Sequence, residues 1–150
     1  MIIVNRIEEH EKHKASLLSK IDVLKDVPGT LIMPGVWSDW GLGSEIVREY
    51  LDEFYDLIDP IMEGVAKSLG FLTPEYLIRD YQMSITKIWF NQYEEGGEHD
   101  WHNHPGCQFT NCYYLELPNA EYSTEVVGAD GKLCKIHAIE GDVMTCSAWM

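Results

Sequence analysis

The stretch CQFTNCYYLELP, residues 107–118, predicts a β-strand and largely decides the fold class. It is rich in aromatic and β-branched residues, which favour strands, and a proline ends it. Four other short runs of similar texture flank it, each bounded by glycine, proline, asparagine or aspartate: residues 83–95, 120–128, 132–141 and 142–150. The second half of the chain is therefore predicted to form the antiparallel strands of a sandwich or open barrel.

Side chains alternate between the two faces of this predicted strand. One face is mainly apolar and is expected to pack under the longer of the two predicted helices; it carries Phe109, Tyr113, Leu115 and Leu117, with Asn111 as an exception. The other face is mixed and is expected to line a small-molecule cavity; it carries Gln108, Thr110, Cys112, Tyr114 and Glu116.

The first third of the chain is predicted to be helical. Leucine and isoleucine recur at helical spacing over residues 17–24. Asn5 followed by Glu8 resembles the capping box that opens a helix. Residues 28–43, rich in glycine and proline, are predicted to form a connection without regular structure.

A second, longer helix is predicted from Ser44 to Gly70, because apolar residues repeat there at steps of three and four. Pro60 is expected to kink or split this helix, since proline removes a backbone donor. A short helical piece is predicted to open at residues 73–75.

The composition predicts one domain spanning residues 1–150, with residues 1–82 as helical support and residues 83–150 as the barrel part. The formal net charge of −14 disfavours binding to nucleic acid or to an anionic membrane. The N-terminal apolar run is too short for a signal peptide, and the four cysteines form no CxxC pair. A cytoplasmic protein with reduced thiols is therefore expected.

Three of the six histidines, His99, His102 and His104, lie within six positions in GGEHDWHNHPG, residues 96–106. Extended residues two apart face the same way at about 6–7 Å, so the last two imidazoles could share one ion. Asp100 has the same parity but lies about 13 Å from the last histidine in an extended chain. A third ligand is expected from another strand; the alternative is that these histidines are solvated loop residues.

His10 and His13, in contrast, lie among charged residues of the first helix and are interpreted as solvated surface side chains.

Residues 83–150 resemble the metal-binding part of the 2-oxoglutarate/Fe(II)-dependent oxygenases, in particular small members from phages and marine bacteria. The similarity is carried, in order, by Trp89-Phe90-Asn91, His102-Asn103-His104-Pro105, Thr110 to Tyr114, and Gly141-Asp142 through Trp149. The resemblance implies an α+β fold with a double-stranded β-helix, a jelly-roll or cupin-like barrel, backed by the N-terminal helices.

The resemblance also implies residue roles. His102 would bind Fe(II), and His104 stands where an aspartate ligand is usual, so either it binds the iron or the site departs from two histidines and one carboxylate. Tyr114 would bind a carboxylate of 2-oxoglutarate, with Thr110 and Asn91 as further contacts. The implied reaction is hydroxylation of a small-molecule or peptide substrate.

Two departures from the family pattern stand near residue 150. Cys146 and Ser147 replace a usual Phe-Pro pair. The family's second histidine and its 2-oxoglutarate-binding arginine would follow Met150, so the sequence is expected to end before the site and the C-terminal strands are complete. Candidates within the chain for the missing ligand are His137, Glu140 and Asp142. Each is expected to be structural, because Gly141-Asp142 is a common turn sequence that needs no metal.

Two alternatives remain open from the sequence. Gly96, His102, His104 and Gln108 nearly match the first cupin motif, which would bind a metal without 2-oxoglutarate. A non-catalytic barrel used in binding or assembly is the other. An open sheet edge near Met150 would also allow a homo-oligomer.

Overall fold

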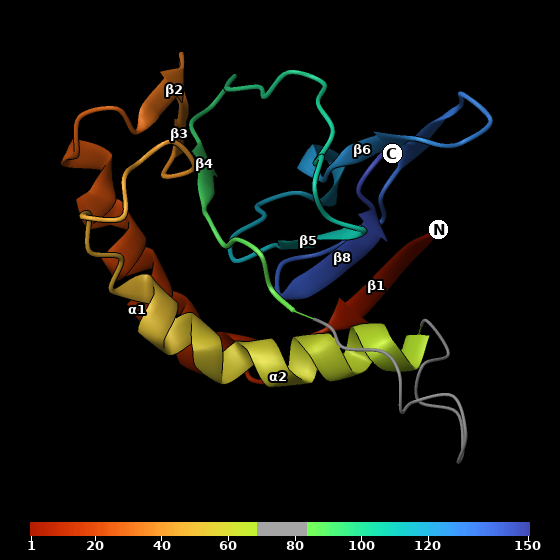
Figure 1. Ribbon diagram of the computed structural model, residues 1–150, viewed down its shortest axis with the longest axis horizontal. Helices are drawn as coiled ribbons and strands as arrows, with labels where there is room; N and C mark the ends of the chain where they lie inside the picture. The colour runs from red at the N-terminus through yellow and green to blue at the C-terminus, as the bar shows by residue number, and fades with distance from the viewer. Residues whose placement is uncertain (69–83) are drawn as a thin grey trace. The chain divides into compact units, whose positions relative to one another are not determined.

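The computed structural model describes residues 1–68 and 84–150 (Figure 1). The chain packs into two compact units. Unit 1 comprises Met1–Lys14, Leu57–Ser84 and Asn103–Met150; unit 2 comprises Ala15–Asp56 and Ile85–His102. Both units draw on segments from either side of residue 83.

Unit 1 is organised by a three-stranded antiparallel sheet. Its order is β1 (Ile2–Arg6), β8 (Asp142–Ser147), β5 (Phe109–Tyr113). The last strand in sequence is thus the central one, and every residue of β8 is buried. In register, Val4 lies opposite Met144 and Asn111 lies opposite Thr145.

A two-stranded hairpin, β6 (Glu125–Val127) and β7 (Leu133–Lys135), contributes to the core of the same unit. It follows the short 3₁₀ helix η3 (Ala120–Tyr122). The core is an apolar cluster, and its buried members are Tyr114, Val126, Ile136, Ala138, Met144 and Cys146.

Unit 2 contains a second antiparallel sheet of order β2 (Leu31–Met33), β3 (Val36–Ser38), β4 (Asn91–Tyr93). The helix α1 (His10–Asp22) runs into the 3₁₀ helix η1 (Val23–Asp26), and its residues from Ala15 onward belong to this unit.

A buried carboxylate ties three segments of unit 2 together. Asp39, whose side chain is 0% exposed, accepts hydrogen bonds from Arg48 Nε at 2.7 Å, from the Tyr50 hydroxyl at 2.7 Å and from the Phe90 backbone N–H at 2.9 Å. Burial and the neighbouring carboxylate raise the pKa of Tyr50, so this hydroxyl keeps its proton and remains a donor.

The strands expected after residue 100 lie within the predicted runs, and all pairings are antiparallel. The first run is shorter than predicted: residues 84–90 are not strand, and β4 begins at Asn91. Residues 28–43 were expected to lack regular structure but contain the β2–β3 hairpin, which turns at Gly35 with φ of 72°. A glycine meets this positive φ without the strain that a side chain would bring.

The expected helices are corrected at several positions. Asn5 lies in strand β1, not at a helix cap, and α1 begins at His10. The helix α2 (Tyr50–Ser68) begins later than Ser44 and runs unbroken through Pro60. The expected stop at Gly70 and the helical piece at residues 73–75 lie outside the described residues.

Helices with antiparallel sheets agree with the α+β class. The described strands form sheets of three, three and two strands, and the double-stranded β-helix remains a proposal. Within residues 1–68 and 84–150, no helix has both the length and the apolar character needed to cross a membrane.

Candidate functional site

The histidine segment contains one imidazole whose orientation is fixed by the backbone. His102 is exposed, and its Nδ1 lies 2.7 Å from the carbonyl oxygen of Asp100. A carbonyl oxygen can only accept, so Nδ1 carries the proton and the lone pair of the neutral ring is on Nε2. Histidines that bind metals are commonly oriented in this way, with the other ring nitrogen bonded to a carbonyl or carboxylate.

His99 lies beside this ring in unit 2. The two ring centroids are 4.4 Å apart. Partial burial and the charge of His102 lower the pKa of His99, which favours the neutral, ligand-competent form of this imidazole.

His104 belongs to unit 1, where its backbone is anchored beside the end of β8. Its N–H donates to the carbonyl of Ala148 at 2.9 Å, and the N–H of Ala148 donates to the carbonyl of Gln108 at 3.1 Å. The end of the histidine segment and the start of β5 are thereby held against the residues that follow β8.

The mixed face of β5, expected to line a cavity, instead contributes Cys112 and Tyr114 to the apolar cluster of unit 1. Val126 of the β6–β7 segment belongs to the same cluster. Tyr114 is only 7% exposed, and its hydroxyl accepts from the N–H of Thr124 at 3.3 Å. Thr110, on the same face, is half-buried opposite Cys146.

Asn91 lies in the other unit from these two residues. It is exposed on β4, where it pairs with Ser38 of β3.

The opposite face of β5 leads to a site that the sequence did not predict. Tyr113 was expected to pack under the long helix, whereas its hydroxyl lies 2.7 Å from Nδ1 of His10, the first residue of the shorter helix α1. Burial raises the pKa of Tyr113 to about 12, so its hydroxyl keeps its proton at neutral pH.

His10 and His13 are buried, 1% and 6% exposed, so the interpretation of both as solvated residues was wrong. The reason is tertiary. β1 pairs with β8, and the N–H of Ile7 donates to the carbonyl of Gly141 at 3.0 Å. The start of α1 is thereby carried against the turn that precedes β8.

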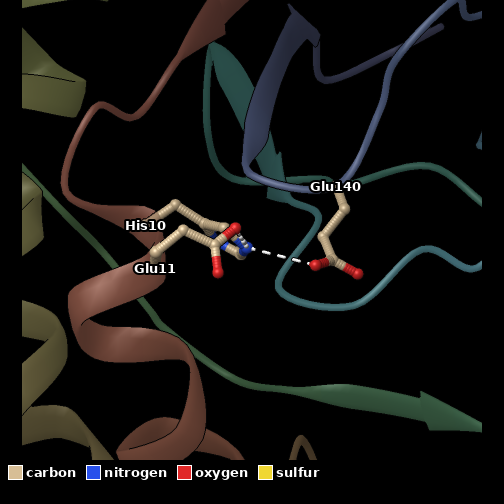
Figure 2. Close-up of side chains that lie close together, drawn as sticks. All are labelled: His10, Glu11 and Glu140. Atoms are coloured by element: carbon tan, nitrogen blue, oxygen red, sulfur yellow. Dashed lines mark hydrogen bonds and ion pairs between the residues drawn. The ribbon is translucent and has the colours of Figure 1, made fainter.

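This turn brings Glu140 to His10. His10 Nε2 lies 3.4 Å from Glu140 Oε1 and 3.8 Å from Glu11 Oε1 (Figure 2). The potential ligand atoms of the three residues lie within 4.8 Å of one another, and this is the one such His/Cys/Asp/Glu group in the part of the chain that the structure describes.

Glu140 also pairs with Lys14, whose Nζ lies 2.6 Å from Oε1. Its other oxygen, Oε2, accepts from the backbone N–H of Leu117 at 3.3 Å. The hydrogen bond from the Lys14 ammonium holds the pKa of Glu140 below its ordinary value, so this carboxyl is an anion at neutral pH.

The chain matches no protein-family model, no curated protein and no solved structure. Its function is therefore inferred from its own residues and from the motif resemblance.

The other in-chain candidates for a third ligand have different surroundings. Asp142 Oδ2 accepts from the N–H of Ile139 at 2.9 Å, and Oδ1 lies 3.3 Å from Arg6 Nη1. These bonds account for Asp142 as a structural residue at the start of β8, directly after the turn at Gly141 with its φ of 86°. His137 is exposed.

Proposed function

We propose that this chain carries the metal-binding part of a non-haem Fe(II)/2-oxoglutarate-dependent oxygenase, which hydroxylates a small-molecule or peptide substrate. The order of four motifs between residues 89 and 149 supports it. The structural observation that carries the proposal is the hydrogen bond from His102 Nδ1 to the Asp100 carbonyl, which directs the Nε2 lone pair away from the backbone.

The donor set fits ferrous iron. Imidazole nitrogens suit Fe(II) in sites that keep coordination positions open. In the proposal His102 binds through Nε2. His104, two residues further along, supplies the second imidazole or stands beside an iron held by another residue. The bond from His104 N–H to Ala148 would keep this part of the segment in place during turnover.

Iron with bound 2-oxoglutarate would supply the activation of O₂, and the residues of the chain would hold the keto acid in position. Thr110 lies on β5, and Tyr114 directly follows the strand with the same parity, so both hydroxyls are proposed as contacts for the keto acid. The Tyr114 hydroxyl would have to exchange its bond with Thr124 N–H for one with a carboxylate. Asn91 is proposed as a contact from the motif alone.

The setting proposed for this activity is the cytoplasm. All four cysteines are free thiols, as expected in a reducing compartment. The net charge of −14 supports a substrate other than nucleic acid and no membrane partner. Pairing of two copies at an open sheet edge remains part of the proposal.

We expect the Fe(II)-loaded full-length protein to develop a visible metal-to-ligand charge-transfer band when 2-oxoglutarate is added without O₂. His102→Ala should abolish the band, because it removes one of the nitrogen donors. Absorption spectroscopy under anaerobic conditions, with iron quantified in the same sample, provides the measurement.

The matched control is His137→Ala, which removes an exposed histidine that is expected to be structural, and it should leave the band unchanged. Iron bound through His102 without a band on adding the keto acid would support the cupin alternative. No dependence of iron binding on His102 would contradict the enzyme proposal and support a non-catalytic protein.

A further inference from the structure

We propose a second, structural divalent-cation site in unit 1, formed by His10, Glu11 and Glu140 and suited to Zn²⁺. It does not depend on the oxygenase proposal, because it shares no residue with the histidine segment. One imidazole nitrogen and two carboxylates are ligands that zinc binds readily.

The imidazole in this group is preorganised. His10 is 1% exposed, and the Tyr113 hydroxyl holds its Nδ1 at 2.7 Å. When Nδ1–H donates to that hydroxyl, the Nε2 lone pair faces the two carboxylates (Figure 2). A histidine fixed through one ring nitrogen, with acidic groups at the other, is the usual arrangement around a bound metal.

The spacing fits the size of the ion. Tetrahedral zinc with bonds of about 2.0–2.2 Å holds its ligand atoms about 3.3–3.5 Å apart. His10 Nε2 and Glu140 Oε1 are already 3.4 Å apart, and Glu11 Oε1 is 3.8 Å from the same nitrogen. The Glu11 side chain is 81% exposed, so it can make the small remaining movement without repacking.

Lys14 is the internal competitor for this position. Its ammonium lies 2.6 Å from Glu140 Oε1, where it supplies the positive charge that the carboxylate pairs with. A divalent ion would replace the ammonium as the positive partner of Glu140. The displaced Lys14 side chain is half-buried and can turn toward solvent. Lys14 should therefore weaken metal binding, because its ammonium competes with the ion for the Glu140 carboxylate.

An ion here would join the first turn of α1 to the turn before β8. Both ends lie within unit 1, so binding should stabilise the folded form of that unit by mass action. The role of the site is thus to hold the β1–β8 end of the sheet closed.

The test uses the full chain carrying His102→Gln and His104→Gln, so that the histidine segment contributes no ligands. Zinc chloride is titrated and followed by calorimetry, with thermal unfolding as a second readout. We expect one Zn²⁺ per chain, a rise in the unfolding temperature, and a loss of affinity of about tenfold or more in Glu11→Gln. Glu8→Gln, the same change at an exposed neighbouring position, should bind as tightly as the parent.

Lys14→Met provides an independent arm, compared with Lys12→Met, which changes the net charge equally. Removal of the competing ammonium should tighten zinc binding by about tenfold, whereas Lys12→Met should change it much less. No zinc uptake, or uptake that Glu11→Gln leaves unchanged, overturns the proposal. Equal affinities in Lys14→Met and Lys12→Met overturn the competition at Glu140.

Discussion

Asp39→Ala is expected to lower the unfolding free energy of unit 2 by about 3–5 kcal/mol. The substitution removes the acceptor of three hydrogen bonds at once, those from Arg48, Tyr50 and Phe90. The side chain of Arg48 is only 15% exposed, so its charge would be left largely buried without a counter-ion. The Tyr50 hydroxyl would lose its acceptor in a buried position, which adds to the cost.

Urea denaturation followed by tryptophan fluorescence measures this effect, because four of the five tryptophans, Trp37, Trp40, Trp89 and Trp101, lie in unit 2. Glu49→Ala, at the exposed residue that follows Arg48, is the control and should change stability by less than about 0.5 kcal/mol. A loss at Asp39 no larger than the control would show that the three hydrogen bonds do not hold the segments together.

Tyr114→Ala is expected to destabilise unit 1 by about 3–5 kcal/mol, because it empties the volume of a buried aromatic ring. The ring packs in the apolar cluster with residues such as Val126 and Met144. Tyr114→Phe keeps the ring and loses only the bond from Thr124 N–H, so it should cost about 1 kcal/mol. Chemical denaturation followed by far-ultraviolet circular dichroism compares the two.

Tyr122→Ala is the matched control, since this tyrosine is 74% exposed and should contribute little. The stable Tyr114→Phe variant also separates the two roles considered for this residue. If Tyr114 binds the keto acid, the variant will need more 2-oxoglutarate to reach half of the charge-transfer band. An unchanged requirement would leave Tyr114 a core residue only.

The strands of the second half could be predicted because their signal is local. Residues such as Thr110 and Val143 have strand propensity, and turn residues separate the runs. The side of β5 that faces the core could not be predicted, since Tyr113 and Tyr114 are the same residue type on opposite faces. Tyr114 is the one covered by apolar residues, because the hairpin near Val126 packs on its side. The pattern of residues within the strand does not show where that hairpin will lie.

The group of His10, Glu11 and Glu140 could not be predicted for a related reason. His10 has charged neighbours in sequence, so its local pattern is that of a solvated helix. Its burial comes from Tyr113 and Glu140, which are more than a hundred residues further along the chain. The strand β1 was also missed, although Ile2–Val4 are β-branched residues that favour strands; its partner β8 lies at the other end of the sequence. The one available signal was the proximity of His10 to Glu11, which is too common to be informative alone.

The central position of β8 affects how unit 1 can form during protein synthesis. β1 leaves the ribosome first and β5 follows, but both pair with a strand that is translated after them. Until Asp142–Ser147 has emerged, the edges of both early strands have no partner from this sheet and the apolar cluster lacks Met144 and Cys146. Pairing over such long sequence separations is slow, and the nascent chain is exposed to aggregation meanwhile. Unit 1 is therefore expected to complete its fold only after nearly all of these residues have been translated.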